Sequence, residues 1–312
     1  MIELRRLHHV ALRAADLDEA ARRWALQFGL TERQRDDAYV RLSCDDEPYA
    51  LELLPAGGAE PGFDHVAYEL ARTCSIADAT AHLDAQGVAW TDAGDHVELA
   101  DLEGNQVHLY GFADAREAWT VFARDPGDVK PGHPRKLGHV NFLTGHLREQ
   151  VDFYTGVLGM RLTDWLGDGG VWLHIGAEHH VMALVKPSPP AHAHFHHLAL
   201  DTVDIGQMRD LLDHLGRHGR WLGWGPTRHG VGGNIASYVR IVEEACFVEL
   251  YCDMELLEPG HEPRVWPDNR YSSNTWGPLP PRSYFRFDEA AIASERDSLE
   301  MQGVPLPDPV SA

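Results

Sequence analysis

The sequence lacks the features of several common protein classes. Four cysteines among 312 residues form no C-x-x-C pair and no disulfide-rich pattern, which favours a reducing, cytoplasmic environment. No run approaches the 18 or more apolar residues of a membrane span, and the first residues show no apolar core of a signal peptide. Basic residues are few: 27 Lys and Arg face 48 Asp and Glu, giving a net charge of −21. We therefore expect neither nucleic acid nor a membrane as a partner.

The sequence does contain enough apolar residues, 44% of the chain, for two hydrophobic cores, and its length favours two domains. It also contains 20 histidines. Most of them are expected on the surface, so the useful question is which histidines recur in a repeated context.

The chain repeats itself at an offset of about 130 residues. The run at 7–12 (LHHVAL) matches the run at 137–142 (LGHVNF), and apolar residues at i, i+4 and i+7 predict helices at 17–28 and 147–158. Gly29 and Gly159 are expected to end these helices, and Asp16 with Glu19 predicts a capping box. A second pair of runs, 63–67 (FDHVA) and 195–199 (FHHLA), precedes helices predicted at 76–86 and 205–218. Closing strands are predicted at 106–110 and 247–251.

Each half is therefore a strand, a helix and several strands, written twice. We predict an α/β (α+β) fold made of tandem βαβββ modules. The predicted parts are an N-terminal domain at 1–125, a Pro- and Gly-rich linker at 126–135, a C-terminal domain at 136–258 and a tail at 259–312. The tail is expected to be disordered at its end.

Five motifs in the second half are similar to those of the type I extradiol (catechol 2,3-) dioxygenases, in the vicinal oxygen chelate superfamily. They are 138–142 (GHVNF), 178–184 (EHHVMAL), 196–200 (HHLAL), 225–230 (GPTRHG), and Tyr238 followed by 248–251 (VELY). The resemblance implies an enzyme that opens a catechol ring with dioxygen at one non-haem iron(II), with manganese(II) as an alternative metal. It also implies that the domain at 136–258 is the catalytic one, that the tail at 259–312 closes over its site, and that the protein is a homo-oligomer, a tetramer or larger.

The resemblance assigns His139, His197 and Glu249 as the metal ligands. Two imidazoles and one carboxylate on one face of an octahedral ion leave the other face open to substrate and oxygen. Other residues compete for two of these places. His196 competes with His197, and since neighbours on a strand face opposite sides, the alignment of 63–65 with 195–197 selects His197. Glu243 and Glu244 compete with Glu249 but lie outside the closing-strand pattern. We expect His192, His194 and His196 to form a solvated strand edge or loop.

The resemblance also implies roles around the metal. His180 is the expected acid and base, and the run at 180–184 favours it over His179. Tyr238 is expected to hydrogen-bond the substrate or an oxygen-derived intermediate, and His229 to support a deprotonated catechol oxygen. Asn141, two residues beyond His139 on its strand, is expected to face the substrate. The segment at 240–247 is one residue longer than the family's turn, which predicts a bulge or an altered turn.

The first half repeats the ligand positions with His9, His65 and His108, in the places of His139, His197 and Glu249. Counterparts of His180, His229 and Tyr238 are absent from it. Because the family usually has an empty N-terminal domain, we expect residues 1–125 to be vestigial and to hold no metal.

Two other functions compete with ring cleavage. A glyoxalase-like isomerase of the same superfamily typically uses a second carboxylate, and a non-catalytic ligand-binding member lacks metal. For the dioxygenase, Trp224 stands where family members that cleave carboxylated catechols commonly have arginine, and the tail offers Ser272, Ser273, Asn274 and Trp276 in similar places. The sequence thus predicts Trp224 in the substrate pocket and an uncharged catechol as substrate.

Overall fold

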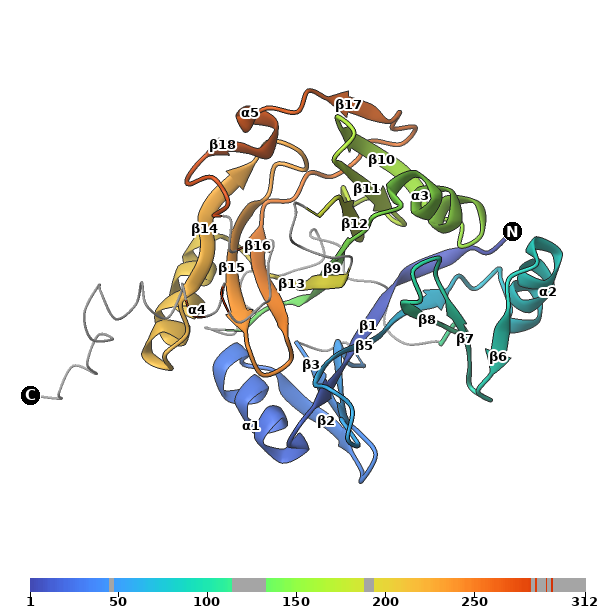
Figure 1. Ribbon diagram of the computed structural model, residues 1–312, viewed down its shortest axis with the longest axis horizontal. Coiled ribbons are helices and arrows are strands. Elements are labelled where there is room, and N and C mark those ends of the chain that lie inside the picture. Colours follow the sequence, from blue (N-terminus) through green and yellow to red (C-terminus); the bar gives the residue numbers. More distant parts are fainter. Residues whose placement is uncertain are drawn as a thin grey trace, which may run out of the picture.

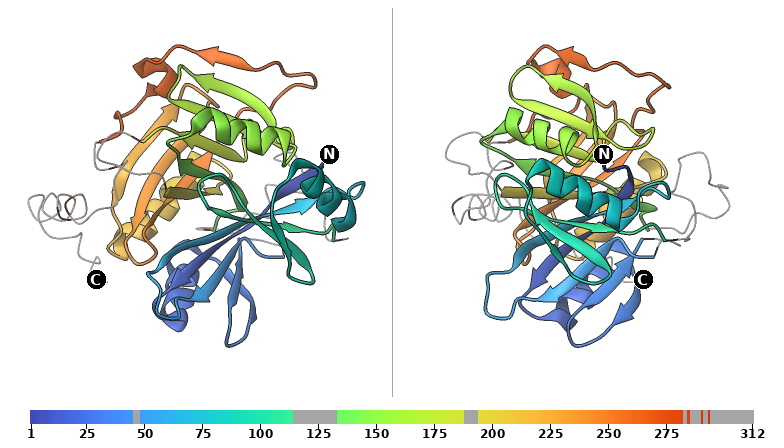
Figure 2. Two further views of the ribbon diagram at one scale, coloured as in Figure 1. Left: turned by 45° about the vertical axis from the view of Figure 1, so that its right-hand side comes forward. Right: turned by 90° about the vertical axis from the view of Figure 1, so that its right-hand side faces the viewer.

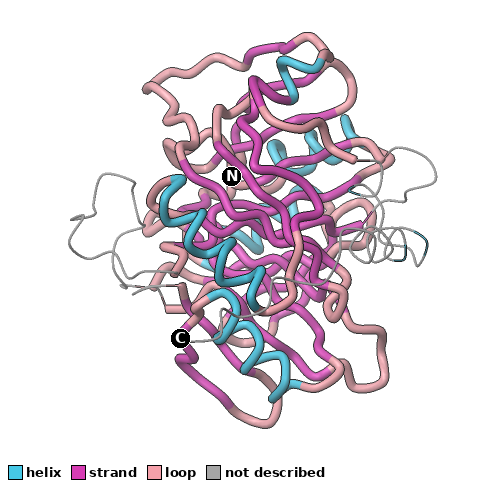
Figure 3. The backbone as a smooth tube through the Cα atoms, turned by 90° about the vertical axis from the view of Figure 1, so that its left-hand side faces the viewer, coloured by secondary structure: helices cyan, strands magenta, loops and turns pink. Residues whose placement is uncertain are grey.

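A computed structural model describes residues 1–44, 48–113, 133–187 and 194–281, and the single positions 284, 290 and 293. The chain forms two curved β-sheets, one in each half, with helices on their outer surfaces (Figures 1 and 3). This mixed α+β architecture is the one predicted from the sequence. Most of the predicted linker and the end of the tail lie outside the described residues, so the predicted domain boundaries stay predictions.

The first sheet has eight strands in the order β2-β3-β4-β1-β5-β8-β7-β6. Its elements are β1 (Leu4–Ala14), α1 (Leu17–Phe28), β2 (Thr31–Arg35), β3 (Val40–Ser43), β4 (Leu51–Pro55), β5 (Gly62–Leu70), α2 (Ile76–Gln86), β6 (Trp90–Asp92), β7 (His96–Ala100) and β8 (Gln106–Tyr110). The antiparallel pair β1–β5 joins two modules of four strands each.

The second sheet repeats this order with one strand added at each edge, β17-β10-β11-β12-β9-β13-β16-β15-β14-β18. Its elements are β9 (Lys136–Leu143), α3 (Leu147–Gly156), β10 (Arg161–Leu166), β11 (Gly170–His174), β12 (Met182–Val185), β13 (His194–Asp201), α4 (Ile205–Arg217), β14 (Leu222–His229), β15 (Ile235–Ile241), β16 (Cys246–Cys252), β17 (Arg264–Trp266), α5 (Arg270–Ser273) and β18 (Asn274–Trp276). The duplication predicted from the sequence is therefore present element by element.

The helix predictions are confirmed except at two ends. The Asp16 side chain caps α1 by accepting from the Glu19 N–H, but the Glu19 carboxylate bonds Arg23 instead of completing a capping box. Helix α3 ends at Gly156, three residues before the predicted stop at Gly159. Gly159 has φ 75°, and a Cβ there would lie 2.1 Å from the Ile2 carbonyl oxygen. That glycine is thus required by close contact with the N-terminal segment rather than by the helix end.

A one-residue β-bulge precedes each of four histidines at equivalent places in the two sheets. In the β1–β5 pair the extra residues precede His9 and His65, and in the β9–β13 pair they precede His139 and His197. Such bulges re-aim side chains and recur next to active sites. One extra residue is Gly138, where a Cβ would lie 1.8 Å from the Tyr251 hydroxyl oxygen.

The two halves pack against each other through a buried ion pair and an aromatic cluster. The Arg23 guanidinium on α1 donates to the Glu244 carboxylate, one bond measuring 3.0 Å, and both side chains are buried. The Phe63 and Phe195 rings stack with centroids 4.5 Å apart. Helices α1 and α4 lie near each other on one side of the molecule (Figure 3), where His214 Nε2 contacts the Leu26 carbonyl oxygen at 2.7 Å.

The segment after β16 returns over the second sheet. Strand β17 pairs with β10 in parallel and β18 pairs with β14 antiparallel, with α5 between them (Figures 1 and 2). Among the described residues, no helix is long and apolar enough to cross a membrane.

Candidate metal centre and active site

The three predicted metal ligands meet on the inner face of the second sheet. His139 comes from β9, His197 from β13 and Glu249 from β16, three adjacent strands. Glu249 Oε2 lies 3.0 Å from His139 Nε2 and 3.1 Å from His197 Nε2. Its other oxygen, Oε1, accepts a 3.0 Å hydrogen bond from Asn234 Nδ2, which fixes the orientation of the carboxylate.

This group fits a divalent metal ion. Metal–ligand bonds of about 2.1 Å at near-right angles place donor atoms about 3 Å apart. Burial opposes the charge of Glu249, but the adjacent His139 and His197 outweigh it and hold the pKa of the carboxyl well below its usual range. Burial lowers the pKa of His197, which keeps that imidazole in the neutral form that metals bind.

The competing carboxylates are engaged elsewhere. Glu244 pairs with Arg23 at the domain interface, and Glu243 pairs with Arg220 at 2.8 Å. Both lie in the four-residue turn between β15 and β16. The pairing of these strands is regular, so the extra residue causes no bulge and is taken up in the turn, where Ala245 has φ 48°.

The expectation for His196 is wrong. His196 is 2% exposed, its Nε2 lies 2.7 Å from the Tyr284 carbonyl oxygen and its Nδ1 lies 2.8 Å from His197 Nδ1. It lines the same cavity as His197 instead of facing the opposite side, because the bulge between Phe195 and His197 breaks the alternation of the strand. His192 lies outside the described residues, and His194 begins β13.

A cavity of about 150 Å³ adjoins the metal ligands, comparable with cavities that hold a single benzene ring. Every remaining predicted site residue lines it: Asn141, His180, Trp224, His229 and Tyr238. The tail contributes Ser272, Ser273, Pro280 and Tyr284 to its wall, whereas Asn274 and Trp276 stay outside it.

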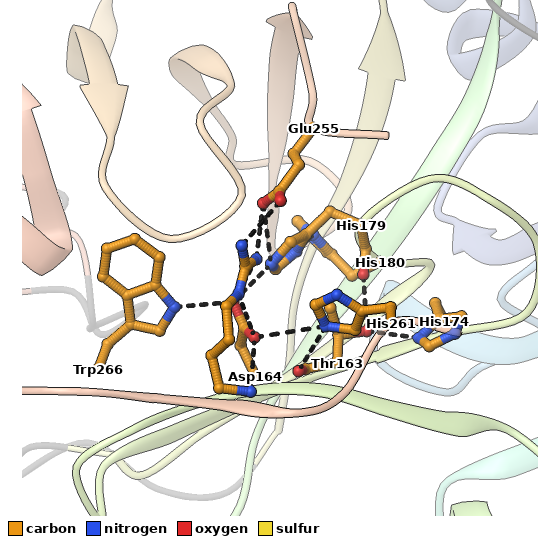
Figure 4. A network of polar contacts seen from close by, with 9 residues as sticks. Thr163, Asp164, His174, His179, His180, Glu255, His261 and Trp266 are labelled. Atoms are coloured by element: carbon orange, nitrogen blue, oxygen red, sulfur yellow. Dashed lines mark hydrogen bonds and ion pairs between the residues drawn. The ribbon is translucent and has the colours of Figure 1, made fainter. Parts of the chain in front are cut away.

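His180 rather than His179 lines the cavity. His179 lies between His180 and Asp164 (Figure 4). The His180 and His139 ring centroids are 4.3 Å apart. His180 Nδ1 lies 3.0 Å from His179 Nδ1, and His179 Nε2 lies 3.0 Å from Asp164 Oδ2. Burial, followed by the nearby His139 ring, lowers the pKa of His180 well below its usual value. The resting imidazole is therefore neutral and connected through His179 to a carboxylate.

Asp164 on β10 is fully buried and held by the returning tail. Its carboxylate accepts from the Arg264 guanidinium and from Trp266 Nε1 at 2.7 Å, besides His179 (Figure 4). Burial opposes its ionisation, but the hydrogen bonds from His179, Arg264 and Trp266 outweigh burial and hold its pKa well below the usual range. Asp164 is thus a fixed anion at the far end of the His179–His180 chain.

Tyr238 and His229 form a second polar pair in the cavity wall. His229 Nδ1 lies 3.1 Å from the Ser273 carbonyl oxygen, and this nitrogen must donate because a carbonyl can only accept. In the neutral ring His229 Nε2 then accepts from the Tyr238 hydroxyl, 2.8 Å away. Burial, then the charge of Glu249, raises the pKa of Tyr238 well above its usual value, so the phenol keeps its proton.

Trp224 packs flat on Tyr238, with ring centroids 4.9 Å apart and an interplanar angle of 9°. Its Nε1 donates to the Pro278 carbonyl oxygen at 2.7 Å. One ring therefore both lines the cavity and fastens the tail to the sheet.

The structure separates the trio predicted in the first half. His9 Nε2 and His65 Nε2 are 3.1 Å apart, but the carboxylate near them is Glu52 on β4. His108 instead stacks on the outside of His65 and groups with His96 and Glu98. The strand pattern correctly placed His108 on the closing strand β8, which lies next to β5. It could not show that the third donor comes instead from β4, which lies next to β1.

Four residues of the site escaped the sequence reasoning: Asn234, Asp164, Tyr284 and His179 as a partner of His180. Asn234 and Asp164 belong to no repeated motif. The signal that was present is the adjacent pair His179-His180 followed by β12, which resembles the pairs His8-His9 and His196-His197; in each of the three pairs the Nδ1 atoms lie within 3.0 Å.

Comparisons with known proteins agree with this geometry. The model of the Glyoxalase/Bleomycin resistance protein/Dioxygenase superfamily matches residues 136–240. Metapyrocatechase 2 of Cupriavidus necator is 32% identical over 307 residues, covering 91% of this chain and 92% of that protein. The 2,3-dioxygenase LapB from Pseudomonas sp. KL28 has a TM-score of 0.73 at 22% identity, covering 86% of this chain and 99% of that one.

The Mn(II)-bound glyoxalase from Novosphingobium aromaticivorans has the same fold, with a TM-score of 0.76 at 21% identity and coverage of 90% and 94% of the two chains. At such identities the solved structures establish the fold, whereas the metapyrocatechase relative establishes the family. The chain belongs to the type I extradiol (catechol 2,3-) dioxygenases of the vicinal oxygen chelate superfamily, enzymes that cleave catechol rings with dioxygen.

Proposed function

We propose that the second half of the chain opens a catechol ring beside its two hydroxyl groups, at an iron(II) ion held by His139, His197 and Glu249. The observation that carries this proposal is that Glu249 Oε2 lies about 3 Å from the Nε2 atoms of His139 and His197, beside an aromatic cavity of one-ring size. Bound iron(II) supplies electron transfer between a catechol and dioxygen, and manganese(II) accepts the same ligands. Both oxygen atoms enter a 2-hydroxymuconate-semialdehyde-type product, so no organic cofactor is consumed.

The chain from Asp164 to His180 determines which nitrogen holds a proton. The Asp164 carboxylate can only accept, so His179 Nε2 donates to it. Neutral His179 then accepts at Nδ1 from His180 Nδ1–H. This arrangement leaves His180 Nε2 as a lone pair for a catechol hydroxyl proton.

Proton uptake reverses the polarity of the chain. When His180 Nε2 takes a proton, the proton on its Nδ1 can pass to His179 Nδ1, and the positive charge then rests on His179 beside Asp164. His180 is again neutral but now donates from Nε2. The same imidazole thus begins as a base and ends as an acid without holding charge in the buried cavity.

Asn141, Tyr238 and His229 complete the polar part of the cavity wall. Tyr238 lies opposite Glu249 in the regular β15–β16 pair, so its hydroxyl is held on the metal side of the sheet. We assign the Tyr238–His229 pair to one catechol oxygen and Asn141 to orientation of the substrate. Among the described lining residues Glu249 is the single carboxylate, which leaves a glyoxalase-like isomerase without its second acid.

The aromatic wall favours an uncharged ring as substrate. Trp224 and Trp172 line the cavity, and the described part of its wall contains neither Arg nor Lys. A carboxylated catechol would bury its charge without a cationic partner, which costs several kcal/mol. We therefore propose catechol, or an alkyl-, halo- or aryl-substituted catechol, as the substrate.

Cellular location and assembly are part of the same proposal. The four cysteines are buried thiols without disulfides, which supports the cytoplasm. A homo-oligomer, a tetramer or larger, follows from the family and is measured by light scattering of the purified protein.

A pair of glutamate variants tests the metal assignment. Protein purified without oxygen and loaded with iron(II) should turn catechol and dioxygen into a yellow product. Glu249→Gln should lose both bound iron and product, whereas Glu243→Gln, the neighbouring carboxylate paired with Arg220, should keep both. Iron and yellow product surviving in Glu249→Gln would refute the assignment.

A further inference from the structure

The duplication has kept a second set of metal donors in the first half of the chain. We propose that His9, Glu52 and His65 bind a divalent metal ion of the zinc class, which stabilises the N-terminal domain and takes no part in ring cleavage. This departs from the expectation that residues 1–125 hold no metal. That expectation considered His108 as the third ligand, which the structure places outside the group.

The two histidines occupy the same places as the ligands of the second half. His9 on β1 and His65 on β5 follow the same one-residue bulges as His139 and His197. Each bulge interrupts the regular hydrogen bonding of the sheet at one of four equivalent positions. In the second half the two bulges direct the imidazoles of His139 and His197 toward the same point. In the first half the outcome is the same, with Nε2 atoms 3.1 Å apart.

The carboxylate comes from the opposite flank of the central strand pair. Glu52 on β4 pairs with Ala11 just as Ala183 on β12 pairs with Asn141, so Glu52 stands where the second half has alanine. Glu52 Oε2 lies 3.8 Å from both His9 Nε2 and His65 Nε2. All three side chains are buried, at 0%, 5% and 4% exposure for His9, Glu52 and His65.

Surrounding contacts present lone pairs to the centre of this group. Asp64 Oδ1 lies 2.8 Å from His65 Nδ1 and must accept, so neutral His65 presents an unprotonated Nε2. A carboxylate behind a histidine in this way is the usual second layer of a metal ligand. Arg41 Nε donates to Glu52 Oε1 at 2.6 Å, which turns Oε2 inward.

A simple hydrogen-bonded core accounts for Glu52 Oε1, which accepts from Arg41, but not for Oε2. One proton shared between His9 and His65 explains their 3.1 Å separation, but Glu52 Oε2 at 3.8 Å is too far from either ring for a hydrogen bond. Bonds of about 2.0–2.2 Å at tetrahedral angles place ligand atoms about 3.3–3.6 Å apart, between the two observed values. Two imidazoles and one carboxylate at this spacing suit zinc(II), with water as a fourth ligand, and cobalt(II) as its spectroscopic substitute.

In the first half no histidine stands at the position equivalent to that of the acid–base residue, so we assign the ion no role in oxygen or proton chemistry. Tyr49 occupies the position of His180, and its ring centroid lies 4.6 Å from that of His9. Since the ligands span β1 and β4 of one module and β5 of the other, the ion ties the two modules together. Its binding energy then appears as stability of the fold.

Full-length Glu249→Ala, in which the other centre is disabled, is the protein to test. After chelation and dialysis it should bind one equivalent of cobalt(II), with the intense visible bands of tetrahedral coordination, and zinc(II) should displace the cobalt. Addition of His65→Ala should abolish this binding, whereas addition of His96→Ala, a histidine of the neighbouring group, should preserve it. Equal cobalt binding with and without His65 would overturn the proposal.

Thermal melting provides the second readout and guards against a variant that folds poorly. Zinc(II) should raise the melting temperature of Glu249→Ala by about 5 °C or more. Zinc(II) should leave the melting temperature of Glu249→Ala/Glu52→Gln unchanged, because the amide is a poor metal ligand. Glutamine keeps the shape of Glu52 and its place beside Arg41, so this variant is expected to fold. An equal rise in both proteins would overturn the proposal. Neither readout uses ring cleavage, and ring cleavage by iron-loaded Glu249→Ala would contradict the active-site assignment instead.

Discussion

Asp164 Oδ2 lies 3.0 Å from His179 Nε2, and through His179 it is connected to the cavity imidazole of His180. The carboxylate itself does not line the cavity. Its effect on chemistry is therefore expected through the proton positions of the two histidines rather than through contact with substrate.

Replacement of Asp164 by asparagine should reduce kcat while leaving binding intact. An amide cannot hold His179 in one protonation state, so His180 loses its fixed direction of proton transfer. General acid–base catalysis typically contributes about 100- to 10,000-fold, and partial loss of it should cost about 10- to 100-fold. We expect this loss in kcat, with bound iron and the KM for catechol nearly unchanged, in steady-state assays across pH 6–9. Asp168→Asn, an exposed carboxylate paired with Lys186, is the matched control. Wild-type kcat in Asp164→Asn would show that the connection is only structural.

The uncharged cavity wall predicts substrate preference. Comparison of kcat/KM should favour 4-methylcatechol over 3,4-dihydroxyphenylacetate by about a hundredfold, which corresponds to 2.7 kcal/mol against burial of an unpaired carboxylate. Trp224→Arg should narrow this ratio, since the cation would lie in the wall. Trp221→Arg, at a partly exposed position outside the wall, should not change it. Preference of the wild-type enzyme for the acid would contradict the assignment of Trp224.

His174 predicts a loss of stability in acid. Burial lowers the pKa of His174 from 6.5 to about 4, and its Nδ1 lies 2.7 Å from the Thr163 hydroxyl oxygen. The unfolded chain therefore binds a proton at higher pH than the folded chain. The contribution of this histidine is complete above pH 6.5 and is progressively lost as the pH falls toward 4. Urea unfolding at pH 7.5 and 4.5 should show a smaller acid loss in His174→Gln than in wild type. Exposed His218→Gln should keep the wild-type loss, and equal losses in all three proteins would exclude His174 as a cause.

The buried pair of Arg23 and Glu244 predicts strong coupling between the halves. Arg23→Met leaves the Glu244 carboxylate buried with only the Trp24 Nε1 donor at 3.2 Å, and removal of one partner of a buried ion pair typically costs 3–5 kcal/mol. The free energy of unfolding from denaturant curves should fall by about that amount. Arg220→Met, which disrupts the half-exposed pair with Glu243, should cost less than about 1 kcal/mol. Similar losses in the two variants would mean that burial does not govern the pair.

Much of the fold was predictable because the duplication lets each half check the other. The run of Leu17, Ala21, Trp24 and Phe28 reappears 130 residues later, and both runs form helices, although the second helix ends at Gly156. The matching runs around His9 and His139 both became central strands. Glu249 was assigned through the family resemblance, and its place in the closing strand favoured it over Glu243 and Glu244.

The sequence could not show two features of the sheets: the positions of the bulges, and which neighbouring strand supplies a side chain to a site. A bulge inserts a residue without any compositional signal, so His196 and His197 were expected on opposite faces. Glu52 reaches the histidines of the first half from β4, which the alignment of closing strands does not cover. Asn234 and Asp164 act through hydrogen bonds to Glu249 and His179. Their partners depend on the curvature of the folded sheet, which the sequence alone does not reveal.

The position of β17 and β18 has a consequence for the size of the active site. They are the two outermost strands of a ten-stranded sheet, which laid flat would separate its edges by about 43 Å. Yet only residues 267–273 connect them, a length that spans roughly 25 Å at most. The sheet is therefore strongly curved, and the short segment 267–273 limits the distance between its two edges. At one end of this segment, Arg264 and Trp266 of β17 donate hydrogen bonds to Asp164. The strands cannot move apart to make room for a bulkier substrate. A change in the size of substrate that the enzyme accepts must therefore come from the side chains that line the cavity, or from detachment of β17 or β18 from the sheet.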